Sequence, residues 1–192
     1  MAHIAVLGLG NWGSAIARLW LLEGHKVKGW TIEQEVYESI TMDGMNNKYL
    51  PEHSLEGLEA TMHVEEALEG SEIIVLAVPS SVILNVVEDI IPHLRPGHVL
   101  LDLAKGLAPG KRLISEAIHQ MLDEKNMHNP LAVLTGPTIA PEAAGGVMTT
   151  ALVASEDVSV AENLASTLTR QPSSYTLHQI LQEQSCGVLS RM

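Results

Sequence analysis

The chain has 192 residues, 46% of them hydrophobic, and its 23 acidic against 11 basic side chains give a formal net charge of −12. This length suits one ordinary domain with a sizeable core, and the composition excludes global disorder. The negative charge speaks against nucleic acid as a partner, because a phosphate backbone is bound by a basic face. The longest apolar run, Ile73–Val78, is too short to span a bilayer, and the single cysteine, Cys186, fits a reducing compartment. We therefore expect an acidic globular protein of the cytoplasm that neither binds nucleic acid nor inserts into a membrane.

Short apolar runs alternate along the chain with segments of helical spacing. The predicted strands are Ile4–Leu7, Val27–Trp30, Ala60–Met62, Ile73–Val78, His98–Leu103, Leu131–Leu134 and Thr150–Val153. The predicted helices are Asn11–Glu23, Glu33–Ile40, Val64–Leu68, Val82–Ile91, Leu113–Leu122 and a stretch that begins after Asp157. Segment 46–51 is predicted to be a loop. Strands that alternate with helices in this way indicate βαβ units, and hence an α/β fold with a doubly wound, mostly parallel sheet.

Three local signals predict where elements begin and end. Pro79 is expected to end the strand at 73–78, because proline cannot donate to a ladder. Ser80 or Ser81 is expected to cap the helix that follows, and Asp157 the last helix.

Gly8, Gly10 and Gly13 form the pattern G-x-G-x-x-G between the first predicted strand and the first predicted helix. In this place the pattern is typical of a dinucleotide-binding turn. We expect Gly8 to allow the tight turn, Gly10 to let the backbone approach a pyrophosphate, and Gly13 to pack helix against strand. The alternative is a glycine-rich turn that binds nothing. With the alternation of strands and helices, the glycine pattern predicts that residues 1–178 form a single NAD-binding domain of Rossmann type. Residues 179–192 are predicted to form a tail that does not continue this pattern.

Glu33 follows the second strand, about 20 residues after Gly13, where a carboxylate accepts the ribose hydroxyls of NAD and repels a 2′-phosphate. The run Trp30–Glu33 contains no arginine, which favours NAD over NADP. The alternative is that Glu33 is a solvated acid in the first turn of a helix.

Three later strand ends carry residues suited to a ligand, since ligands of an open parallel sheet sit beyond the carboxyl ends of its strands. Pro79 follows the fourth strand, Lys105 the fifth, and Gly136 and Thr138 the sixth. Lys105 would present a cation to an anion or carbonyl oxygen, although such a lysine is often simply solvated. The spacing of the histidines and of Cys186 predicts no metal site and no nucleophile.

Five runs, in this order along the chain, resemble NAD(P)-dependent glycerol-3-phosphate dehydrogenase. They are Gly8–Ala15, Asn47–Pro51, Val78–Ser80, Lys105–Leu107 and Gly136–Glu142. The resemblance covers about residues 3–178, which correspond to the N-terminal domain of that family.

The resemblance implies hydride transfer between the nicotinamide of NAD(P)(H) and C2 of glycerol 3-phosphate, which gives dihydroxyacetone phosphate. The implied cofactor contacts are Asn11, Trp12, Lys105 and Ala140, and the implied substrate contacts are Lys105, Gly136 and Thr138. It also implies a cytoplasmic protein, a homodimer in many members, and a role in phospholipid synthesis.

The general acid–base lysine of the family lies in a G-A-x-K-N motif at the start of a second, all-helical domain. Residues Leu177–Met192 contain no such motif, so no catalytic residue is identified here. General acid–base catalysis is typically worth ~10²–10⁴-fold, and we expect this chain by itself to bind NAD(H) and to turn over weakly or not at all. Two alternatives remain open: another dehydrogenase of similar N-terminal architecture, and a non-enzymatic NAD-binding module.

Overall fold

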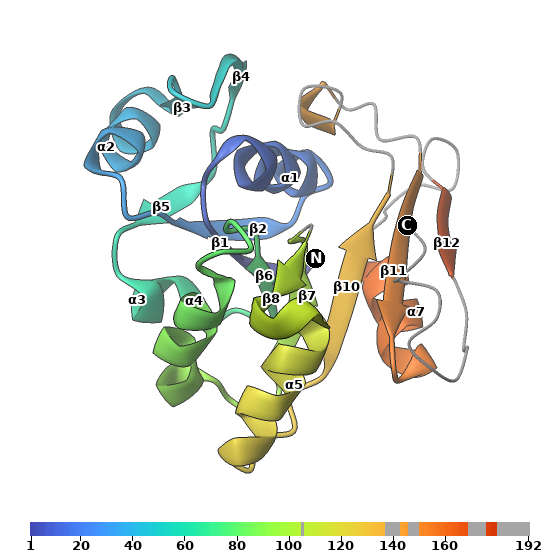
Figure 1. Ribbon diagram of the computed structural model, residues 1–192. Coiled ribbons are helices and arrows are strands. Elements are labelled where there is room, and N and C mark those ends of the chain that lie inside the picture. The colour runs from blue at the N-terminus through green and yellow to red at the C-terminus, as the bar shows by residue number, and fades with distance from the viewer. Residues whose placement is uncertain (105, 137–142, 146–149, 169–175, 180–192) are drawn as a thin grey trace.

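The centre of the molecule is an eight-stranded sheet with the strand order β12-β11-β10-β7-β6-β1-β2-β5 (Figure 1). The computed structural model describes residues 1–104, 106–136, 143–145, 150–168 and 176–179. The strands of this sheet are β1 His3–Leu7, β2 Lys26–Trp30, β5 Glu59–Thr61, β6 Ile73–Leu76, β7 Val99–Asp102, β10 Leu131–Thr135, β11 Thr150–Ser155 and β12 Thr176–Gln179. Neighbouring strands pair in parallel apart from β10 and β11, which are antiparallel. The predicted mostly parallel sheet is confirmed.

Helices pack on both faces of the sheet. One face carries α1 Asn11–Leu22, α2 Gln34–Asp43 and α7 Val158–Leu168, and the other carries α3 Val64–Leu68, α4 Ile83–Ile90 and α5 Ile114–Glu124. The central strands are apolar throughout because both faces are covered: Ile4 and Val6 of β1 belong to one core, whereas Ala5 and Leu7 belong to the other. This arrangement confirms the doubly wound fold.

The predicted loop at 46–51 is wrong, because the chain forms a small antiparallel hairpin there. Its strands are β3 Met45–Asn46 and β4 Leu50–Ser54, with residues 47–49 in the turn between them. Asn46 opens this turn and is fully buried, so the segment is held by the hydrogen bonds of a buried amide, which apolar periodicity does not report. A second hairpin, β8 Leu107–Ala108 with β9 Arg112–Leu113, follows β7.

Two of the three predicted boundary signals are also wrong. Helix α4 begins at Ile83 with Val82 as its N-cap and without a capping side chain, so neither Ser80 nor Ser81 caps it. Strand β6 ends at Leu76, before Pro79, whose carbonyl instead accepts the N–H of Val82 at 3.0 Å in a turn that leads into α4.

The third boundary signal is confirmed, since the Oδ1 atom of Asp157 accepts the N–H of Ser159 at 2.8 Å at the start of α7. Strand β12 reaches Gln179, one residue past the predicted domain boundary, which stays a prediction because residues 180–192 lie outside the described residues. Within the described part of the chain, no helix has both the length and the apolar character that a membrane crossing requires.

The strand order places a topological switch point between β1 and β6. From β1 the chain passes to β2 on one side, and it later returns to place β6 on the other side of β1. In open α/β sheets ligands bind outside the carboxyl ends of the strands at such a point. The turns that follow β1 and β6 therefore define the candidate site.

Candidate functional site

The glycine turn between β1 and α1 is packed tightly against the turn that follows β6. Gly8 has a φ of +103°, and a Cβ on it would lie 2.8 Å from Cγ1 of Val78. A Cβ on Gly13 would lie 1.8 Å from the carbonyl oxygen of Gly8, so a side chain at either position would clash. Among the residues that the structure describes, none lies within 4 Å of a Cβ placed on Gly10. Gly10 therefore borders open space beside the backbone, whereas Gly8 and Gly13 are required by packing.

Helix α1 points its N-terminus at this open space. Its N-cap is Gly10, which has no side chain to cap the helix, and Ser14 donates an N–H to the Gly10 carbonyl at 2.9 Å. The N–H groups of the turn before Ser14 precede the first intrahelical hydrogen bond and carry the positive end of the helix dipole. An exposed Asn11 and a half-buried Trp12 flank this end. The turn is suited to bind an anion such as a diphosphate.

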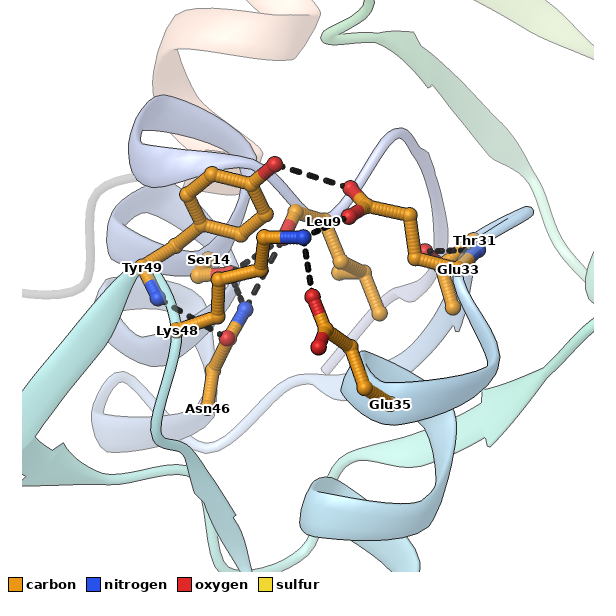
Figure 2. Close-up of polar contacts among 8 residues, drawn as sticks. All are labelled: Leu9, Ser14, Thr31, Glu33, Glu35, Asn46, Lys48 and Tyr49. Atoms are coloured by element: carbon orange, nitrogen blue, oxygen red, sulfur yellow. Dashed lines mark hydrogen bonds and ion pairs between the residues drawn. The ribbon is translucent and has the colours of Figure 1, made fainter.

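Asn46 joins the β3–β4 hairpin to the glycine turn (Figure 2). Its Nδ2 atom donates to the carbonyl of Leu9 at 2.9 Å and to the hydroxyl of Ser14 at 2.8 Å, and that hydroxyl donates to the same carbonyl at 3.1 Å. Its Oδ1 atom accepts the N–H of Tyr49 at 3.1 Å. These bonds fix the middle of the glycine turn from one side. Sequence reasoning missed this residue, since nothing in the pair Asn46-Asn47 shows which amide is buried.

Glu33 lies just beyond the carboxyl end of β2, where the hydroxyl of Thr31, two residues earlier in the chain, accepts the N–H of Glu33 at 3.1 Å. The carboxylate accepts a hydrogen bond from Nζ of Lys48 at 2.5 Å and another from the Tyr49 hydroxyl at 2.9 Å. The bond to Lys48 is the main cause that lowers the pKa of Glu33, and the bond to Tyr49 adds to it. Glu33 is thus held ionised by the hairpin at the N-cap of α2, and its contact with the ribose stays a prediction.

The Lys48 ammonium also contacts the carboxylate of Glu35 in the first turn of α2. These contacts raise the pKa of Lys48 above its usual range, and the bond to Glu33 raises the pKa of Tyr49. Sequence reasoning did not bring the hairpin turn to Glu33, because the two segments approach only once the chain has folded.

The substrate side of the predicted site is described in part. Pro79 is exposed at the turn after β6, and Gly136 is half-buried directly after β10. A Cβ on Gly106 would lie 2.9 Å from the hydroxyl oxygen of Ser80, so the turns that follow β6 and β7 are in close contact. The predicted residues Lys105, Thr138 and Ala140 lie outside the described residues.

Asp102 is a buried acid at the carboxyl end of β7 that the sequence reading did not select. Its side chain is 2% exposed, and its Oδ1 atom accepts the N–H of Ala104 at 2.8 Å. Burial raises the pKa of this carboxyl to about 6, although the bond from Ala104 opposes the rise. No cluster of three or more His, Cys, Asp or Glu side chains suited to a metal ion occurs among the residues that the structure describes.

Comparison with known proteins identifies the family to which this arrangement belongs. A family profile described as NAD-dependent glycerol-3-phosphate dehydrogenase N-terminus matches residues 3–161. The chain is 36% identical over 163 residues to glycerol-3-phosphate dehydrogenase [NAD(P)+] of Halothermothrix orenii, which covers 84% of this chain and 47% of the relative. It is also 36% identical over 194 residues to the enzyme of the same name from Acidobacterium capsulatum, which covers 98% of this chain and 56% of the relative.

Solved structures agree with these sequence matches. The crystal structure of glycerol-3-phosphate dehydrogenase from Coxiella burnetii superposes with a TM-score of 0.81 at 30% identity, covering 92% of this chain and 54% of that chain. Glycerol-3-phosphate dehydrogenase from Saccharomyces cerevisiae, at 23% identity and a TM-score of 0.75, shares the fold, with 92% of this chain and 56% of that chain covered. This chain spans about half the length of these relatives. With its glycine turn, its sheet topology and a profile match over most of its length, the chain belongs to the NAD-dependent glycerol-3-phosphate dehydrogenase family, whose N-terminal part it matches.

Proposed function

We propose that the chain binds NAD(H) in the crevice at the carboxyl ends of β1, β2 and β6. The observation that carries the proposal is the contrast among three glycines: packing demands Gly8 and Gly13, whereas Gly10 opens onto free space at the N-terminus of α1. A diphosphate suits this place, because the helix N-terminus favours an anion and none of the described side chains lies within 4 Å of a Cβ on Gly10. Glu33, at the end of β2, would accept the hydroxyls of the adenosine ribose.

We propose further that the bound cofactor serves the oxidation of glycerol 3-phosphate, the dehydrogenase activity in the names of the relatives, with dihydroxyacetone phosphate as the product that the family resemblance implies. When bound, the nicotinamide would supply or accept the hydride. Asn11, Trp12, Pro79 and Ala140 are proposed to line the cofactor. The proposed substrate contacts are Lys105, whose ammonium would hold an anionic or carbonyl oxygen, together with Gly136 and Thr138.

The proton-transfer group of this reaction is not among these contacts. The 192 residues contain no match to the G-A-x-K-N motif that carries the family's general acid–base lysine. We therefore expect these residues by themselves to bind NADH and to oxidise it slowly, if at all, when dihydroxyacetone phosphate is added. Assembly as a homodimer, a cytoplasmic location and a role in phospholipid synthesis are proposals that rest on the resemblance.

A substitution at Gly10 tests the cofactor site without disturbing the fold. In Gly10→Val the side chain enters the space proposed for the diphosphate, while no residue in the described part of the chain lies within 4 Å of its Cβ. Gly97→Val is the matched control, because a Cβ on Gly97 also has no described residue within 4 Å, and Gly97 precedes β7, at the opposite edge of the sheet. Titration calorimetry with NADH is expected to show binding by the wild type and by Gly97→Val.

For Gly10→Val we expect NADH binding to weaken by about a hundredfold or more, with an unchanged melting temperature of the unliganded protein. Equal affinities of Gly10→Val and wild type for NADH would show that the diphosphate does not lie at this turn. Absence of NADH binding by the wild type would refute the proposed function itself.

A further inference from the structure

Four side chains form a charged cluster above the carboxyl end of β2 (Figure 2). The Lys48 ammonium lies between two carboxylates, with its Nζ atom 2.5 Å from Oε2 of Glu33 and in direct contact with Oε1 of Glu35. The Tyr49 hydroxyl donates to Oε1 of Glu33 at 2.9 Å. Both carboxylate oxygens of Glu33 therefore accept a hydrogen bond from the β3–β4 hairpin.

The position of Lys48 is fixed by more than its ion pairs. Its chain neighbour Tyr49 is bonded to Asn46 through its backbone N–H and to Glu33 through its hydroxyl, and Asn46 at the other end of the turn is bonded to the Leu9 carbonyl. The hairpin turn is therefore attached at both of its ends. The ammonium also lies 5.4 Å from the centre of the Tyr49 ring, within the range of a cation–π contact. Lys48 thus differs from an ordinary surface lysine, although its side chain keeps 42% of its exposure and can meet a ligand.

The charges of this cluster bear on the choice between a 2′-hydroxyl and a 2′-phosphate on the ribose. Two carboxylates alone would give the ribose end of the site a charge of about −2, which repels a phosphate strongly. The Lys48 ammonium removes half of this charge and can itself bind a phosphate oxygen. If Lys48 turned to a phosphate, the Tyr49 hydroxyl would still hold Glu33.

We propose that Lys48, together with Glu33, determines the selectivity of the site between NAD(H) and NADP(H). Its ammonium weakens the discrimination that Glu33 exerts against a 2′-phosphate. This role rests on the proposed function, because it requires a dinucleotide whose ribose lies at Glu33. Lys48 acts as a specificity-determining residue and takes no part in hydride or proton transfer.

The test compares the dissociation constants of NADPH and NADH for the wild type, Lys48→Met, Glu33→Gln and Lys26→Met. Lys26 is the matched control: it is an exposed lysine at the amino end of the same strand β2, so its replacement changes the net charge equally but far from the cluster. In Lys48→Met we expect the ratio of the NADPH constant to the NADH constant to rise about tenfold at low salt. In Glu33→Gln the same ratio is expected to fall, and in Lys26→Met to stay within about twofold of the wild type.

Raising the salt concentration should shrink the effect of Lys48→Met, since exposed charges are screened over about 3 Å at 1 M ionic strength. An unchanged ratio in Lys48→Met, including an equal loss of both dinucleotides, would overturn the inference, as would a similar rise in Lys26→Met. Because NADH binding by the wild type is measured in the same series, failure of the proposed function appears separately, as absence of binding by every protein.

Discussion

Asp102 offers a direct test of how the carboxyl edge of the sheet is built, because it is an acid buried at the end of β7. Its side chain is 2% exposed, and burial raises the pKa of its carboxyl from 3.8 to about 6. In the unfolded chain the same carboxyl is in water and titrates near its ordinary value. We predict that Asp102→Asn removes a pH-dependent destabilisation of the wild-type fold.

The sign follows from the protons bound in each state. Below about pH 4 both states keep the Asp102 proton, and the group has no effect on the free energy of unfolding. Between about pH 4 and 6 the unfolded chain releases this proton while the folded protein still holds it, so stability falls as the pH rises. Above about pH 6 both states have released the proton, and the free energy of unfolding falls no further through this group. A rise in pKa from 3.8 to about 6 corresponds to at most about 3 kcal/mol.

Urea unfolding of wild type and Asp102→Asn at several pH values between 4 and 8 measures this difference. The amide can still accept the N–H of Ala104, and any constant cost of its NH₂ group does not depend on pH. We expect the stability of the variant relative to the wild type to increase by up to about 3 kcal/mol between pH 4 and pH 7. Parallel stability curves over this range would refute the reasoning.

Asp157→Asn serves as a control of opposite sign. Hydrogen bonds from Ser159 to the Asp157 carboxylate lower the pKa of this exposed group, so it stabilises the fold above its ordinary pKa and ceases to do so as the pH falls. We therefore expect Asp157→Asn to be less stable than the wild type at pH 7, with the difference disappearing in acid.

Two further substitutions test the glycine turn and its support. Gly13→Ala is expected to lower the free energy of unfolding by more than about 3 kcal/mol, because its Cβ would lie 1.8 Å from the carbonyl oxygen of Gly8; a thermal unfolding curve close to that of wild type would contradict this. Asn46→Ala is expected to lower the free energy of unfolding in urea by about 3 kcal/mol, because it removes the buried amide that donates to Leu9 and Ser14. A decrease below about 0.5 kcal/mol would show that these bonds are unimportant.

The central strands were predictable from the sequence because a strand buried on both faces is an unbroken run of apolar residues. Strand β6 has no polar residue between Ile73 and Leu76, and such a run between turn signals is typical of a covered parallel sheet.

The residues at which helices and strands begin and end were less predictable. The N-cap of α4 is Val82, because the turn that begins at Pro79 holds its carbonyl to the Val82 N–H and so starts the helix without a side-chain cap.

The candidate site was predictable to the extent that its residues are local in sequence. The glycine pattern could be placed because strand, turn and helix follow one another within Ile4–Leu22. The surroundings of Glu33 could not be predicted, since its partners Lys48 and Tyr49 come from a hairpin that lies beyond a whole helix in the chain. The burial of Asp102 could not be predicted either, because its position as the last residue of β7 depends on pairing with β6.

The β3–β4 hairpin is the element that connects these separate parts. At one point Asn46 bonds the carbonyl of Leu9 in the glycine turn, and two residues later Lys48 pairs with Glu33 beyond β2. The hairpin therefore spans from the predicted diphosphate position to the predicted ribose position, and both are held by the same short turn. It follows that a change at the Lys48 pair should alter the ribose end alone while Asn46 remains bonded. Loss of Asn46, which bonds both the Leu9 carbonyl and the Tyr49 N–H, should weaken the binding of both NADH and NADPH. The two residues can thus be told apart by the same pair of titrations.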